Sequence, residues 1–314
     1  MFSFHYIHDA PLIDVASHGQ LEGNANGPSL IRAPDWLSNP PACYLLYFAH
    51  HEGRSIRLAT SDHLRGPWRI YPQSPLELEQ SLFASSPPLQ HELDEEALAF
   101  IAAGADGNYP HIASPDIWVD HEQQQIRMYY HGRLQNGLQR SRVATSTDGL
   151  NFEARDEIIG PPYLRLFRHN NWFYAIGFPG QLFRSRDGLT GFETGPILTG
   201  EAIRHHALLQ QGQQWYLFWT RVGDAPERIL VSRLDTSSDW LHWRMDEAEE
   251  VHRPRKPWEG ALLENQASSY GSSMQPVNQL RDPAIYCEDD NIYLLYSSAG
   301  EQGIAMGEIR ILAT

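Results

Sequence analysis

A short strand rich in aromatic residues returns five times along this chain of 314 residues. Each copy follows a shorter apolar segment and a polar turn, and a third apolar segment comes after it. The five copies are Cys43-Tyr-Leu-Leu-Tyr-Phe, Ile126-Arg-Met-Tyr-Tyr-His, Trp172-Phe-Tyr-Ala-Ile, Trp215-Tyr-Leu-Phe-Trp and Ile292-Tyr-Leu-Leu-Tyr. A regular repeat of this kind indicates one supersecondary unit that is used several times in a single architecture.

A fourth segment follows a turn in most copies and carries an aromatic residue. It reads Pro67-Trp68, Asn151-Phe152, Gly191-Phe192 and Trp240 to Trp243. Four short antiparallel strands per repeat are typical of a β-propeller blade. The sequence therefore predicts an all-β fold, a five-bladed β-propeller, as one domain over residues 1–314. The last copy has three strands, so we expect Phe2 to Ile7 to complete that blade and close the ring. A β-sandwich does not account for so regular a repeat.

Two long connections interrupt the repeat, near residues 71–113 and 246–279. Connections of this length within a compact domain are usually functional. In a propeller the second and fourth strands end on the face where the first strands begin. We therefore expect both connections to crowd one end of the central channel.

Charge and composition exclude several classes of function. A formal net charge of −15 argues against nucleic acid and anionic membranes as partners. No apolar run reaches the length of a membrane span, and the N-terminus does not resemble a signal peptide. We expect a cytoplasmic protein, although a mature secreted chain would look the same. Cys43 and Cys287 are expected to be buried free thiols rather than a disulfide.

Residues that can carry acid–base chemistry recur near the starts of the first strands. Counting ten residues back from each second strand gives Asp282, His205, Asp116 and Pro162, and Gly27 takes the equivalent place in the first blade. One aspartate or histidine at a strand start usually caps a turn. Three of them at one register, with different residues in the other blades, favour a single axial site.

Other candidates are expected on the same face. As substrate-binding residues we expect Asn26, His50, His51, Glu79, His111, His131, Arg204, Arg221, Trp258 and Arg281. Glu259, on the second long connection, is a candidate general acid. The histidines and cysteines lack zinc-site spacing, and neither a phosphate-binding loop nor a nucleophile elbow is present. No protein metal site is predicted.

Three short motifs resemble those of known enzymes. Arg281-Asp282-Pro283 resembles a motif of glycoside hydrolase families 32 and 68, and Ser114-Pro115-Asp116-Ile117 and Glu259-Gly260 resemble motifs of family 43. The predicted architecture is also similar to families 117 and 130. These families usually place an aspartate on the first blade's inner strand, where this chain has Asn26-Gly27.

The resemblance implies hydrolysis of an oligosaccharide. Asp282 or Asp116 would be base or nucleophile, and His205 or Glu259 would protonate the leaving oxygen. The arginines at the channel mouth suggest an anionic sugar. No cofactor is required, and the resemblance leaves open a divalent cation, such as calcium, on the axis. Two alternatives are a lyase that uses His205 as base and a carbohydrate-binding propeller without catalysis.

Overall fold

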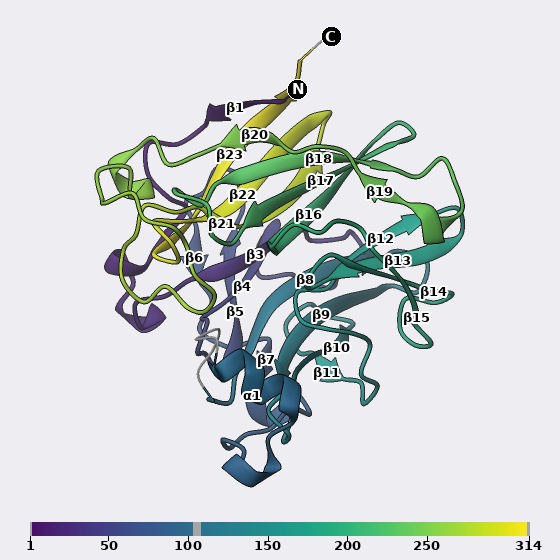
Figure 1. The fold of residues 1–314 in the computed structure, drawn as a ribbon. Helices are drawn as coiled ribbons and strands as arrows, with labels where there is room; N and C mark the ends of the chain where they lie inside the picture. The colour runs from purple at the N-terminus through teal and green to yellow at the C-terminus, as the bar shows by residue number, and fades with distance from the viewer. Residues whose placement is uncertain (1, 103–107, 313–314) are drawn as a thin grey trace.

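The computed structural model describes residues 2–102 and 108–312, and most of its regular structure is β (Figure 1). Five antiparallel sheets stand side by side, and the first strand of each is in contact with the first strands of its neighbours. The predicted five-bladed β-propeller is therefore confirmed. In the described residues no helix is long and apolar enough to cross a membrane.

The strands follow the chain from the inside of each blade to its outer edge. Blade one contains β3 (Asn26–Arg32), β4 (Tyr44–Ala49), β5 (Ser55–Ser61) and β6 (Arg69–Ile70), with β7 (Leu76–Glu77) also on β5. Blade two contains β8 (Ile112–Asp120), β9 (Gln125–Arg133), β10 (Gln139–Ser146) and β11 (Glu153–Ala154). Blade three contains β12 (Arg165–His169), β13 (Trp172–Gly177), β14 (Gln181–Ser185) and β15 (Glu193–Ile197). Blade four contains β16 (Ile203–Gln211), β17 (Gln214–Arg221), β18 (Ile229–Asp235) and β19 (Arg244–Met245), with β20 (Glu249–His252) also on β18.

Blade five joins the two ends of the chain. It contains β21 (Arg281–Glu288), β22 (Asn291–Ser298) and β23 (Gly303–Ile311), with β1 (Phe2–Tyr6) as its outer strand and β2 (Ile13–Asp14) also on β23. Phe2 lies opposite Ile311 in this ladder. The Phe2 ring also packs edge-on against Tyr216 and Phe218 of blade four, at centroid distances of 5.0 and 5.1 Å. The expected closure by the N-terminal strand is confirmed.

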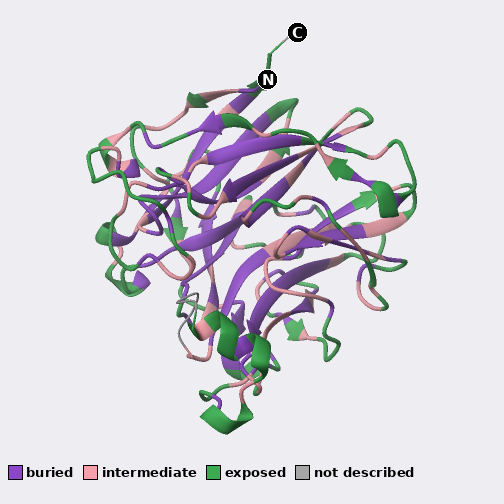
Figure 2. Cartoon of the chain, viewed as in Figure 1, coloured by how far each residue is buried: buried purple, intermediate pink, exposed green. Residues whose placement is uncertain are grey.

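The second strands are largely buried because each lies between two neighbouring blades (Figure 2). In β4, Leu45 and Tyr47 pack into the core shared with blade two, whereas Leu46 and Phe48 pack into the core shared with blade five. Alternate side chains of a strand point to opposite faces, so a strand buried on both faces has no polar side. Burying one such side chain contributes about 2 to 3 kcal/mol.

Two details differ from expectation. The aromatic residues assigned to the fourth strands precede them: Trp68 comes before β6, and Phe152 comes before β11. Both rings are buried in the packing between blades, which leaves only a short ladder for the outermost strand. Cys43 and Cys287 are free thiols, but both are exposed because they lie at the strand ends that face away from the core.

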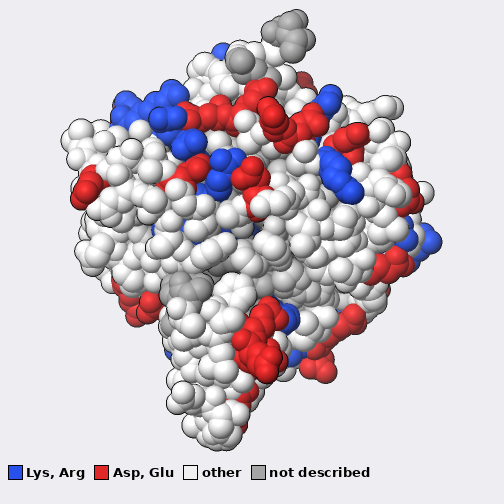
Figure 3. All heavy atoms as spheres, in the orientation of Figure 1, with Lys and Arg blue, Asp and Glu red and all other residues white. Residues whose placement is uncertain are grey.

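The long connections contain the helices that matter for the site. The first includes β7, the 3₁₀ turns Leu78–Gln80 and Gln90–Glu92, and α1 (Glu95–Ala102), which projects beside blade two (Figure 1). The second includes β20 and the 3₁₀ turn Pro257–Glu259. The remaining 3₁₀ turns are Val15–Ser17, Gly19–Leu21 and Trp240–His242. On the face in Figure 3, acidic and basic groups are interleaved.

Candidate functional site

The first strands of four blades start with the same β-bulge. Two residues on the inner strand oppose one on the second strand between Asn26 and Ser29, between Ala113 and Asp116, between Ile203 and His206, and between Arg281 and Ala284. A bulge locally twists a strand and re-aims its side chains. Blade three has no such bulge at β12, and Pro161-Pro162-Tyr163 leads into that strand instead.

Three of the four bulges have left-handed backbone at the equivalent position. Gly27 has φ 59°, Ser114 has φ 51° and Asp282 has φ 49°. A Cβ atom at residue 27 would lie 2.9 Å from Ser114 Cα, so glycine is required there by both conformation and contact. An aspartate side chain, which the families whose motifs resemble those of this chain usually carry on the first blade, therefore has no room at Gly27. A left-handed aspartate costs on the order of 1 kcal/mol, and such strain often accompanies a functional site.

The ten-residue count is wrong in detail for two blades. By ladder register, the residues equivalent to Asp282 are Ser114 in blade two and Arg204 in blade four. The turn between β8 and β9 is two residues longer than the turn between β21 and β22, so Asp116 lies two residues further along its strand. In blade four the paired strands between the bulge and the turn are one residue longer than in blade five, so ten residues back from Trp215 gives His205, one residue after the equivalent position.

His205 and Asp282 nevertheless meet at the axis. His205 Nδ1 lies 2.9 Å from Asp282 Oδ1, and the Ser297 hydroxyl donates to Asp282 Oδ2 at 2.8 Å. Both side chains of the pair are almost completely buried. Burial lowers the pKa of His205, although the Asp282 carboxylate opposes this shift. Burial opposes ionisation of Asp282, but His205 and Ser297 hold its pKa below the usual value. The pair therefore consists of a neutral imidazole and a carboxylate near pH 7.

A second histidine–carboxylate pair lies beside the first. His51 Nδ1 is 3.2 Å from Glu301 Oε1, and Arg281 Nη1 is 2.9 Å from the same oxygen. Arg281 Nε is also 3.9 Å from Glu227 Oε2. The other carboxylate oxygen of Glu227, Oε1, is 2.9 Å from Arg204 Nε. Despite complete burial, His51 and Arg281 hold the pKa of Glu301 far below its usual value. These five side chains form a chain of alternating charge, which we call the charge ladder.

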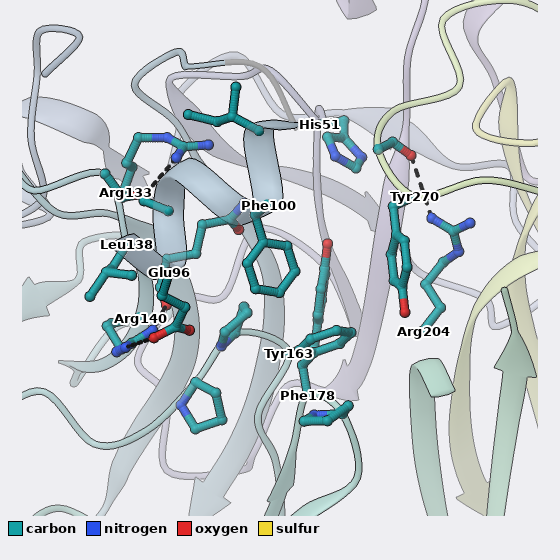
Figure 4. Close-up of a pocket in the computed structure, with 18 residues that line it drawn as sticks. His51, Glu96, Phe100, Arg133, Leu138, Arg140, Tyr163, Phe178, Arg204 and Tyr270 are labelled. Carbon is teal, nitrogen blue, oxygen red and sulfur yellow. Dashed lines mark hydrogen bonds and ion pairs between the residues drawn. The ribbon is translucent and has the colours of Figure 1, made fainter. Parts of the chain in front are cut away.

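The upper cavity borders the charge ladder at His51 and Arg204 and has a volume of about 330 Å³. His51 and Arg204 line it, together with Tyr163, Phe178 and Tyr270 (Figure 4). The Tyr163 ring packs between His131 and His205, with centroid distances of 4.6 Å to each. Tyr163 thus separates His205 from the wider part of the cavity and gives the cavity an aromatic floor.

A lower cavity of about 150 Å³ lies further along the inner strands, where Asp116 is found. One or more residues of every inner strand line it: Ser29, Leu30, Asp116, Ile117, Arg165, Leu166, Ala207, Leu208, Ala284 and Ile285. Arg165 donates to the carbonyl oxygens of Ser114, Pro115 and His206, and Asp116 Oδ2 accepts from the Leu166 N–H at 2.8 Å. Burial raises the pKa of Asp116. Asp116 and Arg165 thus brace the inner ring below the upper cavity.

Glu259 lies away from both cavities and is completely buried. Its carboxylate accepts hydrogen bonds from the hydroxyls of Tyr6 and Tyr296, from His252 Nε2, and from two backbone N–H groups. The expected position beside the axis is therefore wrong, because Glu259 instead fastens its connection to the outside of blade five. Trp258 packs against Tyr6 in the same region.

Several expected binding residues also lie outside the upper cavity. Glu79 is a surface residue paired with Arg54, and Arg221 pairs with Glu201 at 3.0 Å. His50 accepts from the Glu52 N–H within its own turn at 3.0 Å. His111 packs edge-on against His131, whose pKa lies well below the usual value, chiefly because of burial and then because of His111 and other nearby histidines. Asn26 donates to Glu301 Oε2 at 3.3 Å and so supports the charge ladder.

The sequence analysis missed two buried carboxylates, Glu227 and Glu301. Both follow a second strand, which ends on the face of the upper cavity. His51 follows the end of β4 in the same way, so the turns after β17 and β22 could have been chosen from the sequence as well. Tyr163, Phe178 and Tyr270 were missed because they lie in loops without a repeat position.

The described residues do not contain three His, Cys, Asp or Glu side chains placed to hold a metal ion. The carboxylates of Asp282, Glu301 and Glu227 are already paired with histidines and arginines. These three carboxylates therefore do not fit the divalent cation that the resemblance left open.

The fold is that of the five-bladed propellers of glycoside hydrolase family 43. CoXyl43, a β-xylosidase/α-arabinofuranosidase from a compost microbial metagenome, superposes with a TM-score of 0.61 and 13% identity, over 99% of this chain and 96% of its own. A family 43 enzyme from Xanthomonas citri gives a TM-score of 0.59 and 11% identity, over 97% of this chain and 90% of its own. The resemblance noted in the motifs is thus confirmed at the level of the fold.

The sequence itself is similar to Uncharacterized protein R118 of Acanthamoeba polyphaga mimivirus. The two chains are 37% identical over 308 residues, which cover 90% of this chain and 82% of the viral protein. No family model matches the chain. The chain therefore belongs to the same family as the mimivirus protein.

Proposed function

We propose that this protein hydrolyses glycosidic bonds of a neutral oligosaccharide in the upper cavity. The observation that carries the proposal is the meeting of two histidine–carboxylate pairs, His205–Asp282 and His51–Glu301, at one end of the propeller axis. Glycoside hydrolysis needs one group that protonates the leaving oxygen and another that activates water or attacks the sugar. A histidine held by a carboxylate can do either. CoXyl43, which has the same fold, is described in complex with xylotriose.

In this proposal His205 is the general base. Its lowered pKa leaves the imidazole neutral at pH 7, and the Asp282 carboxylate beside Nδ1 favours the tautomer with the proton on Nδ1, so that Nε2 is free to accept a proton. Water attacks the anomeric carbon as Nε2 takes one of its protons. Asp282 then stabilises the imidazolium that forms. The sugar lies beside His51 in the upper cavity, and the Tyr163 ring, which packs against His205, moves aside so that water reaches Nε2.

His51 is the general acid. It lines the cavity, and its Nδ1 lies beside the ionised Glu301, whose charge stabilises the protonated imidazole. As the glycosidic bond breaks, His51 donates its proton to the leaving oxygen. The rest of the charge ladder holds Glu301 in place through Arg281 at 2.9 Å.

The state of the arginines favours a neutral rather than an anionic sugar. Arg204 and Arg281, which suggested an anionic substrate, are both paired with buried glutamates. A uronate would have to displace one of these carboxylates to gain their charge. The same pairing removes the main support for a lyase, which needs cations to neutralise the substrate carboxylate.

The experiment is a screen of the purified protein against defined oligosaccharides, with the variants His205→Ala, Asp282→Asn and His51→Ala and the exposed control Glu79→Gln. We expect wild type and the control to release reducing sugar, and each site variant to lose about 100-fold or more in kcat. Products that absorb in the ultraviolet would indicate a lyase. Binding without turnover would leave a carbohydrate-binding propeller, and full activity in the variants would refute these roles.

A further inference from the structure

Aromatic rings from three separate segments wall the outer part of the upper cavity. Phe100 comes from α1, Phe178 from the turn after β13, and Tyr270 from the second long connection (Figure 4). The ring centroids of Phe100 and Phe178 are 6.0 Å apart, and those of Phe178 and Tyr270 are also 6.0 Å apart. We call these three rings the aromatic wall. Through Phe178, the two long connections meet over the same cavity.

The aromatic wall is not part of the packed core. Phe100 is 38% exposed, and Phe178 and Tyr270 are half-buried. Aromatic rings beside a concave site offer large, rigid apolar faces, and such faces commonly bind one side of a ligand ring. The wall continues directly from Tyr163, which lines the same cavity.

The charged groups at the outer part of the cavity are hydrogen-bonded within the protein. Arg140 Nη2 lies 3.1 Å from Glu96 Oε2, a pair that also ties α1 to β10. Arg133 donates to the carbonyl oxygens of Tyr109 and Gly137, at 3.1 and 2.5 Å. Glu96 remains about half exposed, so its carboxylate can accept hydrogen bonds from ligand hydroxyls. Apolar ring faces next to paired charges suit a neutral polyhydroxylated ring.

We infer that the aromatic wall is a second sugar subsite, which binds the unit next to the one whose bond is cleaved. The inference rests on the proposed function and specifies its substrate as a neutral oligosaccharide of at least two sugar units. The cavity of about 330 Å³ is near the lower end of the range for small-molecule sites, roughly 300 to 1,000 Å³. That size fits a short oligosaccharide rather than a long stretch of polymer.

The test uses two kinds of substrate with the same sugar. A trisaccharide reaches the aromatic wall, whereas a glycosyl fluoride has no second unit. The variants are Phe178→Ala and Tyr270→Ala, and the control is Leu262→Ala, which lies on the same connection as Tyr270 and is 82% exposed. We expect kcat/KM for the trisaccharide to fall about tenfold or more in both wall variants, as for other aromatic residues that anchor a ligand. Hydrolysis of the fluoride should be unchanged in all three variants.

An equal fall for both substrates would mean that the wall supports the fold, and no fall would mean that it binds nothing; either result overturns the inference. Calorimetry with xylotriose, cellotriose and arabinotriose separates this inference from the proposed function, because binding needs no turnover. Binding by wild type that weakens about tenfold in the wall variants supports the subsite even if no bond is cleaved. The inference is overturned if wild type binds none of the three trisaccharides at millimolar concentration. It is also overturned if a uronate-substituted xylotriose binds more tightly than xylotriose.

Discussion

Replacing Glu259 by glutamine removes a negative charge that is buried and accepts hydrogen bonds from five donors. The Tyr6 and Tyr296 hydroxyls lie 2.7 and 2.6 Å away, and His252 Nε2 lies 2.7 Å away. The N–H groups of Arg255 and Lys256 add bonds of 2.8 and 2.9 Å. These donors come from β1, β22, β20 and the connection itself. Glu259 thus ties the closing strand of the ring to blades four and five.

The size of the effect follows from the pKa of Glu259. Burial opposes ionisation, but hydrogen bonds from His252, Tyr296 and the backbone lower the pKa from 4.5 to about 2. A shift of that size corresponds to about 3 kcal/mol of unfolding free energy. Because the folded pKa lies below the unfolded one, this stabilisation is complete above pH 4.5 and is lost as the pH falls through 2. By pH 4 wild type should already have lost about 1 kcal/mol of it.

The assay is urea denaturation followed by tryptophan fluorescence, for wild type and Glu259→Gln at pH 7 and pH 4. We expect the variant to be about 3 kcal/mol less stable at pH 7, and the difference to shrink by about 1 kcal/mol at pH 4. Glu79→Gln, an exposed glutamate on the other long connection, serves as control and should leave stability unchanged. Equal stability of wild type and Glu259→Gln at pH 7 would refute the reasoning. If Glu259→Gln lost activity but kept its stability, Glu259 would be a catalytic residue, as the sequence alone suggested.

Three further outcomes are expected. Activity should fall as the pH drops through the lowered pKa of His205, because the protonated imidazole cannot act as base; a rate that rises toward acid would contradict this role. Gly27→Ala should cost about 1 to 3 kcal/mol by chemical denaturation, since its Cβ would meet Ser114 in a left-handed backbone; unchanged stability would show that the bulge can relax. Treatment with EDTA should leave any glycosidase rate unchanged, because the axial side chains do not form a metal-binding set; a rate restored only by calcium would disprove this.

Part of the candidate site could be predicted from the repeat. The start of the first strand in a blade faces the axis, and this places His205 and Asp282 together without knowledge of any contact. The end of the second strand lies on the same face, which correctly brings His51 to the cavity. Asp116 was misplaced because a turn two residues longer shifts the strand register, and each shift of two residues moves a side chain one layer along the axis.

Loops could not be placed in the same way. Glu259 has a local sequence like that of a catalytic acid, yet it binds Tyr6 and Tyr296, which lie 253 and 37 residues away in the chain. Glu301 lies in a short turn without a distinctive motif, yet it accepts from His51 and Arg281 at the axis. Local sequence specifies which groups a loop carries but does not specify which distant groups they meet.

The sequence by itself determined the architecture. Strands buried on both faces must be apolar throughout, and turns must be polar, so the five copies could be counted from side-chain type alone. Even the ring closure followed, because a three-stranded last blade leaves an edge that another strand must cover. Tertiary structure alone decided which charges are compensated and which rings share a cavity. The sequence does not show which carboxylate pairs with Arg204. In the folded protein Glu227 neutralises its charge. That pairing depends on three-dimensional distances between blades, and these distances set the chemistry of the axial site.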